Sequence, residues 1–243
     1  MFFTNFLNKI GMNLFTKENK VISIVRESIY LLPVLNRFDI RPGLHDATIQ
    51  EICVEKNINV DFFLAIINTY AHQHYFPKTK LLSFSPLLII NYLRKTHEYY
   101  AQYVVPSIDA SLAELLQSSK HEKSDIHLIQ SFYSKYIQEF LKHNEVEEKT
   151  VFPYIISIFE NPALADGRLA HKTFEKEHKQ IEDKLHDLKN LLLKYMDTDY
   201  DENLYNDFLF RLFLFEKDTK DHARIEDVIL FPIARALEKN TRI

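Results

Sequence analysis

The feature that most restricts the fold of this chain is a pattern of polar residues that occurs twice. The pattern reads His-x3-Glu-x4-Phe-Pro, first as His143, Glu147 and Phe152-Pro153, and again as His222, Glu226 and Phe231-Pro232. From His143 to His222, the copies are 79 residues apart. A spacing of four places each histidine and its glutamate on one helix face, one turn apart. His97 and His178 precede the two copies and are 81 residues apart, so the region is interpreted as two similar helical hairpins.

The sequence around these patterns is typical of long helices. The chain has only 3 glycines among 243 residues, which is too few for the tight hairpins of a β-sheet. Apolar residues recur at intervals of three and four along four stretches, at about residues 86–118, 124–160, 166–196 and 204–240. Four such helices with short connections predict an all-α protein with an antiparallel four-helix bundle over residues 86–243.

Six polar residues interrupt the apolar stripes at positions that should face the bundle interior. They are His97, His143, Glu147, His178, His222 and Glu226. On each hairpin the two histidines lie within about two residues of the same depth, or ~3 Å along the helix. A buried carboxylate is costly unless it is paired. A buried lysine or arginine is the alternative partner, but no basic residue interrupts the stripes near Glu147 or Glu226, so we expect bound metal ions.

The number and type of these donors indicate two metals. Six ligands exceed the four of a structural zinc site, whereas two metals that each bind two histidines and share two carboxylates use all six. Imidazole with carboxylate and no thiolate favours iron or manganese, with zinc as the alternative. Five-coordinate metals would keep one position open for a small ligand.

Two local expectations concern the first and second bundle helices. Pro106 lies inside the first and should kink it, either for packing or to open a path for a small molecule. Glu145 and Glu148 flank Glu147, and we expect both on the exposed face of the second helix, with only Glu147 turned inward.

The first third of the chain is expected to form a separate helical domain over residues 1–76, followed by a linker over residues 77–85. Apolar residues from Ile22 to Leu32 fit one face of a helix. Thr48 and Glu51 have the spacing of a capping box.

Composition and hydropathy exclude several other classes of protein. A net charge of −4 provides no basic surface for nucleic acid or anionic lipid. The longest apolar run, residues 81–93, is interrupted by polar residues and is shorter than the roughly 20 residues that span a bilayer. Cys53 is the only cysteine, so an internal disulfide is excluded. We expect Cys53 to be buried in a helix. The N-terminus lacks the features of a signal peptide. We expect a cytoplasmic protein that binds neither nucleic acid nor membrane.

With these residues in place, the chain resembles the hemerythrin-like (HHE) cation-binding proteins, and more narrowly the RIC family, the di-iron proteins for repair of iron centres. The resemblance implies that the four histidines are terminal ligands of two iron ions. It also implies that Glu147 and Glu226 bridge them, together with an oxo or hydroxo group. Similarity extends into the N-terminal domain, but typical members carry Cys-Cys-Gly-Gly where this chain has Arg41-Pro42-Gly43-Leu44-His45.

The resemblance implies a protein of nitrosative or oxidative stress that reacts with NO or O2 and supports repair of iron–sulfur centres. Iron–sulfur proteins and a second copy of the chain are the partners that it implies. The alternative is a sensor of O2, NO or iron that signals through a partner protein without catalysis. A purely structural bundle is a third hypothesis, and the six polar residues of the core argue against it.

Overall fold

The computed structural model describes residues 13–41, 43, 45–118, 124–165, 169, 171–195 and 200–240. Within these ranges the chain is helical, and the pairing of Lys20 with Thr48 is an isolated β-bridge rather than a strand. The chain divides into two compact units, Met1–Ser85 and Pro86–Ile243. No helix in the described ranges combines the length and the apolar character required to cross a bilayer.

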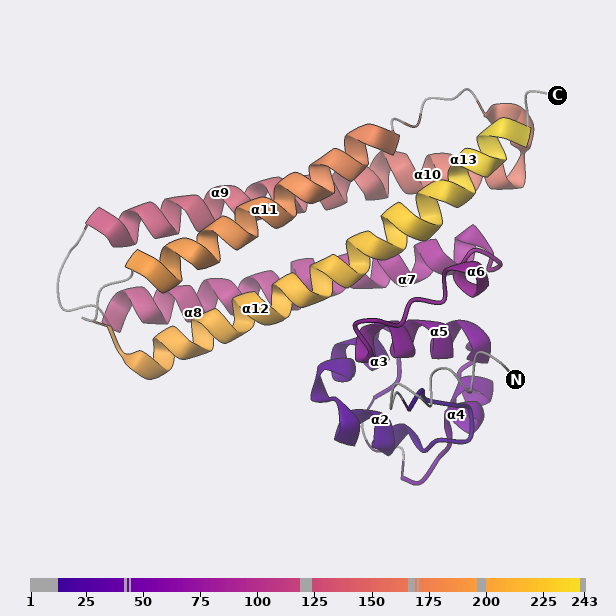
Figure 1. The fold of residues 1–243 in the computed structure, drawn as a ribbon, viewed down its shortest axis with the longest axis horizontal. Coiled ribbons are helices and arrows are strands. Elements are labelled where there is room, and N and C mark those ends of the chain that lie inside the picture. Colours follow the sequence, from indigo (N-terminus) through magenta and orange to yellow (C-terminus); the bar gives the residue numbers. More distant parts are fainter. Residues whose placement is uncertain are drawn as a thin grey trace. The chain divides into compact units, whose positions relative to one another are not determined.

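The second unit confirms the predicted all-α bundle (Figure 1). Its helices are α7 (Pro86–Tyr99), η2 (Tyr100–Val104), α8 (Val105–Ser118), α9 (Ser124–Val146), η3 (Glu147–Val151), α10 (Phe152–Glu160), η4 (Pro162–Leu164), α11 (His171–Tyr195), α12 (Glu202–Ile225), η5 (Glu226–Leu230) and α13 (Phe231–Asn240). The segments α7–η2–α8, α9–η3–α10, α11 and α12–η5–α13 each form one long rod, and successive rods run in opposite directions. Helix α9 packs on α11, α8 on α12, and α10 on α13.

The ends of two rods differ from the sequence-based expectation. The third was expected over residues 166–196, whereas α11 spans His171–Tyr195, and residues 166–168, 170 and 196 lie outside the described ranges. The fourth begins two residues earlier than expected, because the side chain of Asp201 accepts hydrogen bonds from the backbone N–H groups of Asn203 and Leu204.

Three short π-helical segments within the described rods are each followed by a residue and then a proline. In η3 the N–H of Phe152 donates to the carbonyl of Glu147, five residues back, and Pro153 follows. In η5 Phe231 donates to Glu226 in the same way, ahead of Pro232. A proline ring clashes with the carbonyl four residues earlier, and a wider turn removes that clash. The repeated Phe-Pro pairs therefore mark two π-turns that begin at the two predicted metal-binding glutamates.

The same arrangement occurs at Pro106. The N–H of Val105 donates to the carbonyl of Tyr100 across η2. We expected Pro106 to kink the first bundle helix. In the structure Pro106 follows a π-turn that begins at the buried Tyr100.

The bundle core lies mainly between α8, α9, α11 and α12. It contains many large side chains, among them Ile108, Tyr136, Phe140, Leu188, Phe208 and Phe215. One charged pair is enclosed with them, because Lys189 of α11 donates to the carboxylate of Glu216 on α12. The Lys189 ammonium also lies 4.0 Å from the centroid of the Phe213 ring. The sequence reasoning did not find this pair.

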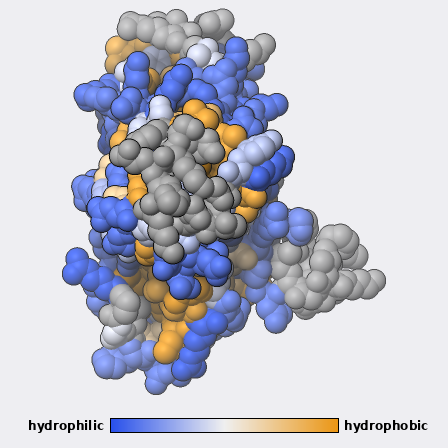
Figure 2. Space-filling model, turned by 90° about the vertical axis from the view of Figure 1, so that its left-hand side faces the viewer, coloured by the Kyte–Doolittle hydropathy of each residue, from blue (hydrophilic) through white to orange (hydrophobic). Residues whose placement is uncertain are grey.

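Some apolar side chains remain on the bundle surface. Leu193, Phe210 and Phe213 are exposed on α11 and α12. Figure 2 shows hydrophobic patches among mostly hydrophilic residues on the face that it presents. Exposed apolar side chains of this kind are ordinary on protein surfaces.

The first unit is a small cluster of short helices. They are α2 (Val21–Glu27), η1 (Ile29–Leu31), α3 (Leu32–Arg37), α4 (Ile49–Glu55), α5 (Val60–Ala71) and α6 (Lys78–Leu81). The capping box of Thr48 and Glu51 is present at the start of α4, and Cys53 is buried in that helix, as expected.

Two features of the first unit differ from the expectation. The helix expected from Ile22 to Leu32 is interrupted, because Ser28 is extended between α2 and η1. The segment expected as a linker, residues 77–85, contains α6, and its Leu81 is buried in this unit. In the turn around Gly43, which has a φ of 102°, Pro42 and Leu44 lie outside the described residues.

Candidate metal centre

The bundle brings together all six residues that the sequence pattern identified. All six side chains are buried, and the two glutamates are fully inaccessible to solvent. Each rod contributes at the same level: α7 carries His97, α9 and η3 carry His143 and Glu147, α11 carries His178, and α12 and η5 carry His222 and Glu226. The repeated spacing of four therefore does place each histidine beside its own glutamate.

The first half of the cluster contains His97 and His222. Their Nε2 atoms lie 3.0 Å apart. The Nε2 of His222 is 3.1 Å from Oε1 of Glu226, and the Nε2 of His97 is 3.5 Å from Oε2 of Glu147. These four residues offer atoms that all lie within 4.8 Å of one another.

The second half contains His143 and His178. The Nε2 atom of each lies 3.4 Å from Oε1 of Glu147, and the Nε2 of His178 also lies 3.4 Å from Oε2 of Glu226. Each carboxylate thus directs one oxygen toward one histidine pair and the other oxygen toward the second pair. That is the arrangement required of two carboxylates that bridge two metal ions.

The distances and the missing hydrogen bonds both fit a cation. Ligand atoms bound at about 2.1 Å to one metal lie roughly 3.0–3.4 Å apart when they are neighbours. No described residue donates an ordinary hydrogen bond to either oxygen of Glu147 or Glu226, and the Nε2 atoms of His143 and His178 also have no such partner in the described ranges. Buried polar atoms of this kind are costly unless something else satisfies them.

The two carboxylates have opposite pKa shifts. Burial, together with the neighbouring charge of Glu147, raises the pKa of Glu226 to about 8. Burial also opposes ionisation of Glu147, but the nearby imidazoles of His143 and His178 outweigh it and lower the pKa of Glu147. Without a cation, therefore, one carboxylate is ionised and the other holds a proton near neutral pH. A divalent metal must displace that proton when it binds.

An outer set of carboxylates orients the imidazoles. The Nδ1 of His97 lies 2.8 Å from Oε1 of Glu148, and the Nδ1 of His178 lies 2.8 Å from Oδ1 of Asp227. Glu177 lies 3.2 Å from the Nδ1 of His143. A proton on Nδ1, donated to a carboxylate, leaves Nε2 free to bind a metal.

The position of Glu148 corrects the sequence-based expectation. We expected Glu148 on the exposed face, but its side chain is only partly exposed, since it accepts hydrogen bonds from His97 and from Nε of Arg94. Glu148 and Asp227 each follow a central glutamate, and each contacts the lone histidine of its own hairpin. The repeat is thus His-x3-Glu-(Glu/Asp)-x3-Phe-Pro. Both copies carry an acidic residue directly after the central glutamate, and comparison of the copies would have identified it.

We expect replacement of Glu148 or Asp227 by its amide to weaken metal binding by about 10–100-fold, because the charge that orients the histidine is lost. Competition with a chromophoric chelator measures the affinity. Glu145→Gln is the matched control, since Glu145 is an exposed residue of the same helix and pairs with Lys149. Affinities of Glu148→Gln and Asp227→Asn equal to that of the control would contradict the orienting role.

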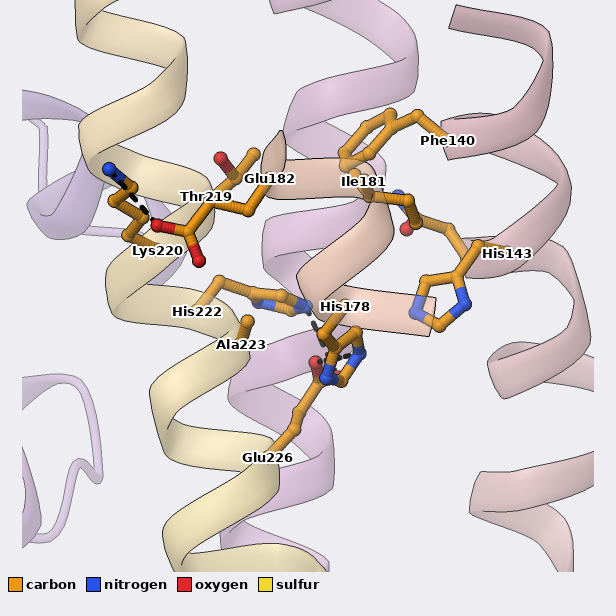
Figure 3. Close-up of a pocket in the computed structure, with 11 residues that line it drawn as sticks. Phe140, His143, His178, Ile181, Glu182, Thr219, Lys220, His222, Ala223 and Glu226 are labelled. Atoms are coloured by element: carbon orange, nitrogen blue, oxygen red, sulfur yellow. Dashed lines mark ion pairs between the residues drawn. The ribbon is translucent and has the colours of Figure 1, made fainter. Parts of the chain in front are cut away.

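A small cavity adjoins the cluster (Figure 3). Its volume is about 40 Å³, and its lining includes Phe140, His143, His178, Ile181, His222 and Glu226. A water molecule requires roughly 10–15 Å³ on this measure, so a diatomic molecule fits. Glu182, Thr219 and Lys220 also line it, with Lys220 paired to Glu182 at 3.0 Å.

Comparison with known proteins gives one family. The family model of the hemerythrin HHE cation binding domain matches residues 89–234, a segment that includes all six residues of the cluster. No curated protein matches the chain.

Proposed function

Since this chain belongs to the hemerythrin HHE cation-binding domain family, we propose that its six clustered side chains hold two iron ions and that the loaded protein reacts with NO or O2. His97 and His222 would bind one ion, and His143 and His178 the other. Glu147 and Glu226 would bridge the pair, with an oxo or hydroxo group completing the bridge. Manganese and zinc are the alternative metals.

The observation that carries this proposal is the position of the small cavity beside six buried donors. Imidazole and carboxylate donors without thiolate suit iron. When bound, the iron pair supplies an electron-rich site for a diatomic ligand. The protein's own residues orient the imidazoles through Glu148, Asp227 and Glu177. Phe140 and Ile181 supply apolar wall to the cavity, beside the polar side chains of Glu182, Thr219 and Lys220.

The proposed biological role is protection in nitrosative and oxidative stress, including support for repair of iron–sulfur centres. Iron–sulfur proteins are the proposed partners for that role, and a homodimer is a further proposal. We also propose a cytoplasmic location, on the ground that the chain's single cysteine offers no internal disulfide.

The test is the response of the reduced, iron-loaded protein to each gas. The protein is reduced and handled without oxygen, and NO or O2 is then added. We expect each gas to change the absorption spectrum as soon as it is mixed with the protein. The same protein loaded with zinc is the control, because zinc has no accessible redox change. A reduced iron protein whose spectrum is unchanged by both gases would contradict the proposal.

A sensor that acts through a partner protein is the second candidate, and the N-terminal unit favours it. Burial raises the pKa of the Cys53 thiol to about 11, so this unit offers no reactive thiolate at neutral pH. A compact helical unit without thiol chemistry suits docking. A stable, reversible NO or O2 adduct without turnover, together with one specific bound protein, would support the sensor over the stress-response role.

A further inference from the structure

A line of three tyrosines starts at the candidate metal centre. The Tyr100 ring meets the His222 ring edge to face, with centroids 5.7 Å apart and the planes at 73°. Tyr100 is completely buried.

The line continues outward through Tyr99 and Tyr103. The Tyr99 ring lies 6.3 Å from Tyr100, and the Tyr103 ring stacks on Tyr99 at 5.6 Å with an interplanar angle of 22°. Tyr103 is 61% exposed. The three rings therefore connect the buried His222 to solvent through successive ring contacts.

The backbone explains why the line turns outward. Tyr99 is the last residue of α7, and Tyr100 and Tyr103 lie in the π-turn that precedes Pro106. Adjacent helical residues point in different directions, so Tyr100 faces the core while Tyr99 lies on an outer face. Residues four apart, such as Tyr99 and Tyr103, lie over one another. Pro106 thus has a consequence beyond packing, because it shapes the turn that carries two of the three phenols.

Two phenyl neighbours of Tyr100 do not provide an equivalent route. Its remaining ring contacts include Phe140 and Phe215, whose phenyl rings are far harder to oxidise than a phenol. Beyond Phe140 lies Tyr136, which is itself buried. The chain has no tryptophan. The path through Tyr99 is made of phenols from its start at Tyr100 to the exposed ring of Tyr103.

We propose that Tyr100, Tyr99 and Tyr103 form a one-electron conduit between the metal centre and an external reductant. The inference rests on the proposed redox-active centre. Hydrogen peroxide is the oxidant, and its reduction to two water molecules at the loaded centre takes two electrons and two protons. Tyr103 would supply these electrons one at a time through Tyr99 and Tyr100. Each time, Tyr103 releases its phenolic proton to water and becomes a neutral tyrosyl radical. A small thiol then donates a hydrogen atom that restores the phenol, and the two thiyl radicals formed per peroxide combine into a disulfide.

The conduit would protect the protein from oxidising equivalents that remain at the centre after reaction. It delivers them to an exposed side chain where a soluble reductant removes them. Without such a reductant, two exposed tyrosyl radicals from different molecules couple into dityrosine. That product gives a readout that is independent of turnover.

The experiment exposes the full-length, iron-loaded protein to hydrogen peroxide without added thiol. Rapid-freeze electron paramagnetic resonance measures the tyrosyl radical, and fluorescence with denaturing gels measures dityrosine-linked dimers. We expect both signals in the unmodified protein. Tyr103→Phe should lose the linked dimer, and Tyr99→Phe should lose it too with iron content unchanged. Tyr195→Phe is the matched control, since Tyr195 is 68% exposed on α11, and it should behave as the unmodified protein does.

Several outcomes would overturn the conduit. One is an unchanged dimer yield in both Tyr99→Phe and Tyr103→Phe. Another is the same yield from zinc-loaded protein, because peroxide would then oxidise tyrosine without the centre. Iron content and the absorption spectrum of each sample separate this failure from failure of the proposed function. A protein that holds no iron overturns both proposals, whereas iron-loaded variants with undiminished yield overturn the conduit alone.

Discussion

Replacement of Glu226 by glutamine is expected to prevent formation of the two-metal centre. The Glu226 carboxylate directs one oxygen toward His222 and the other toward His178, so its loss affects both metal positions at once. An amide keeps one weak oxygen ligand but loses the negative charge and the bridge. We expect the metal content after loading and dialysis to fall to at most one ion per chain, as measured by elemental analysis.

The same variant should separate metal binding from folding. Because the pKa of Glu226 is raised to about 8, its carboxyl holds a proton at neutral pH without metal, and a neutral amide replaces it closely. We therefore expect the metal-free variant to melt near the unmodified metal-free protein. The stabilisation that iron adds, about 4 kcal/mol for one site at a free concentration of 1,000 times Kd, should be lost for at least one of the two ions. Glu145→Gln is the control, and two tightly bound ions in Glu226→Gln would contradict the bridging role.

Replacement of Lys189 by methionine should cause the second large effect, on stability. Lys189 and Glu216 form a buried ion pair in the bundle core. Removal of Lys189 leaves the buried Glu216 carboxylate with one remaining partner, Lys220 at 3.4 Å. We therefore expect a cost near the lower end of the about 3–5 kcal/mol that breaking a buried pair typically causes. We expect the free energy of unfolding in urea to fall by about this amount. Lys184→Met is the matched control on α11, because Lys184 pairs with Glu139 at a more exposed site, where a pair is worth about 0–1 kcal/mol.

The effect should depend on pH in a defined direction. Burial opposes ionisation of Glu216, but Lys189 outweighs it and lowers the pKa of Glu216. A lowered pKa stabilises the fold above the ordinary glutamate pKa, and this contribution is lost as the pH falls through the folded value. The difference in the free energy of unfolding between the unmodified protein and Lys189→Met should therefore shrink in acid.

A Lys189→Met/Glu216→Leu protein should recover much of the stability that Lys189→Met loses. Equal stabilities of Lys189→Met and Lys184→Met would contradict the account.

The bundle and the cluster could be predicted because both depend on one periodic signal. Apolar residues at helical spacing place a stripe against the core, and His97, His143, His178 and His222 occupy positions within those stripes. The repeat then indicated that the two hairpins are alike. Convergence of the six side chains is present in the structure, whereas their action as metal ligands stays a prediction.

Features that depend on contacts between helices were missed. The partners of Glu148 and Asp227 lie on neighbouring rods, so helical periodicity assigned Glu148 to the surface. The π-turns involve backbone hydrogen bonds one residue out of register, which side-chain patterns do not reveal. Lys189 and Glu216 were missed because a charged residue is normally assigned to the surface. Each is buried because its charge is neutralised by the other residue, which lies on a different helix.

Metal stoichiometry tests the central claim most directly. Metal-free protein titrated anaerobically with Fe²⁺ should bind two ions per chain, and X-ray absorption should show imidazole and carboxylate ligands with a metal–metal distance of about 3.5–4 Å, as in other two-metal sites. Binding of one ion per chain, or of none, would contradict a dinuclear centre at His97, His143, Glu147, His178, His222 and Glu226.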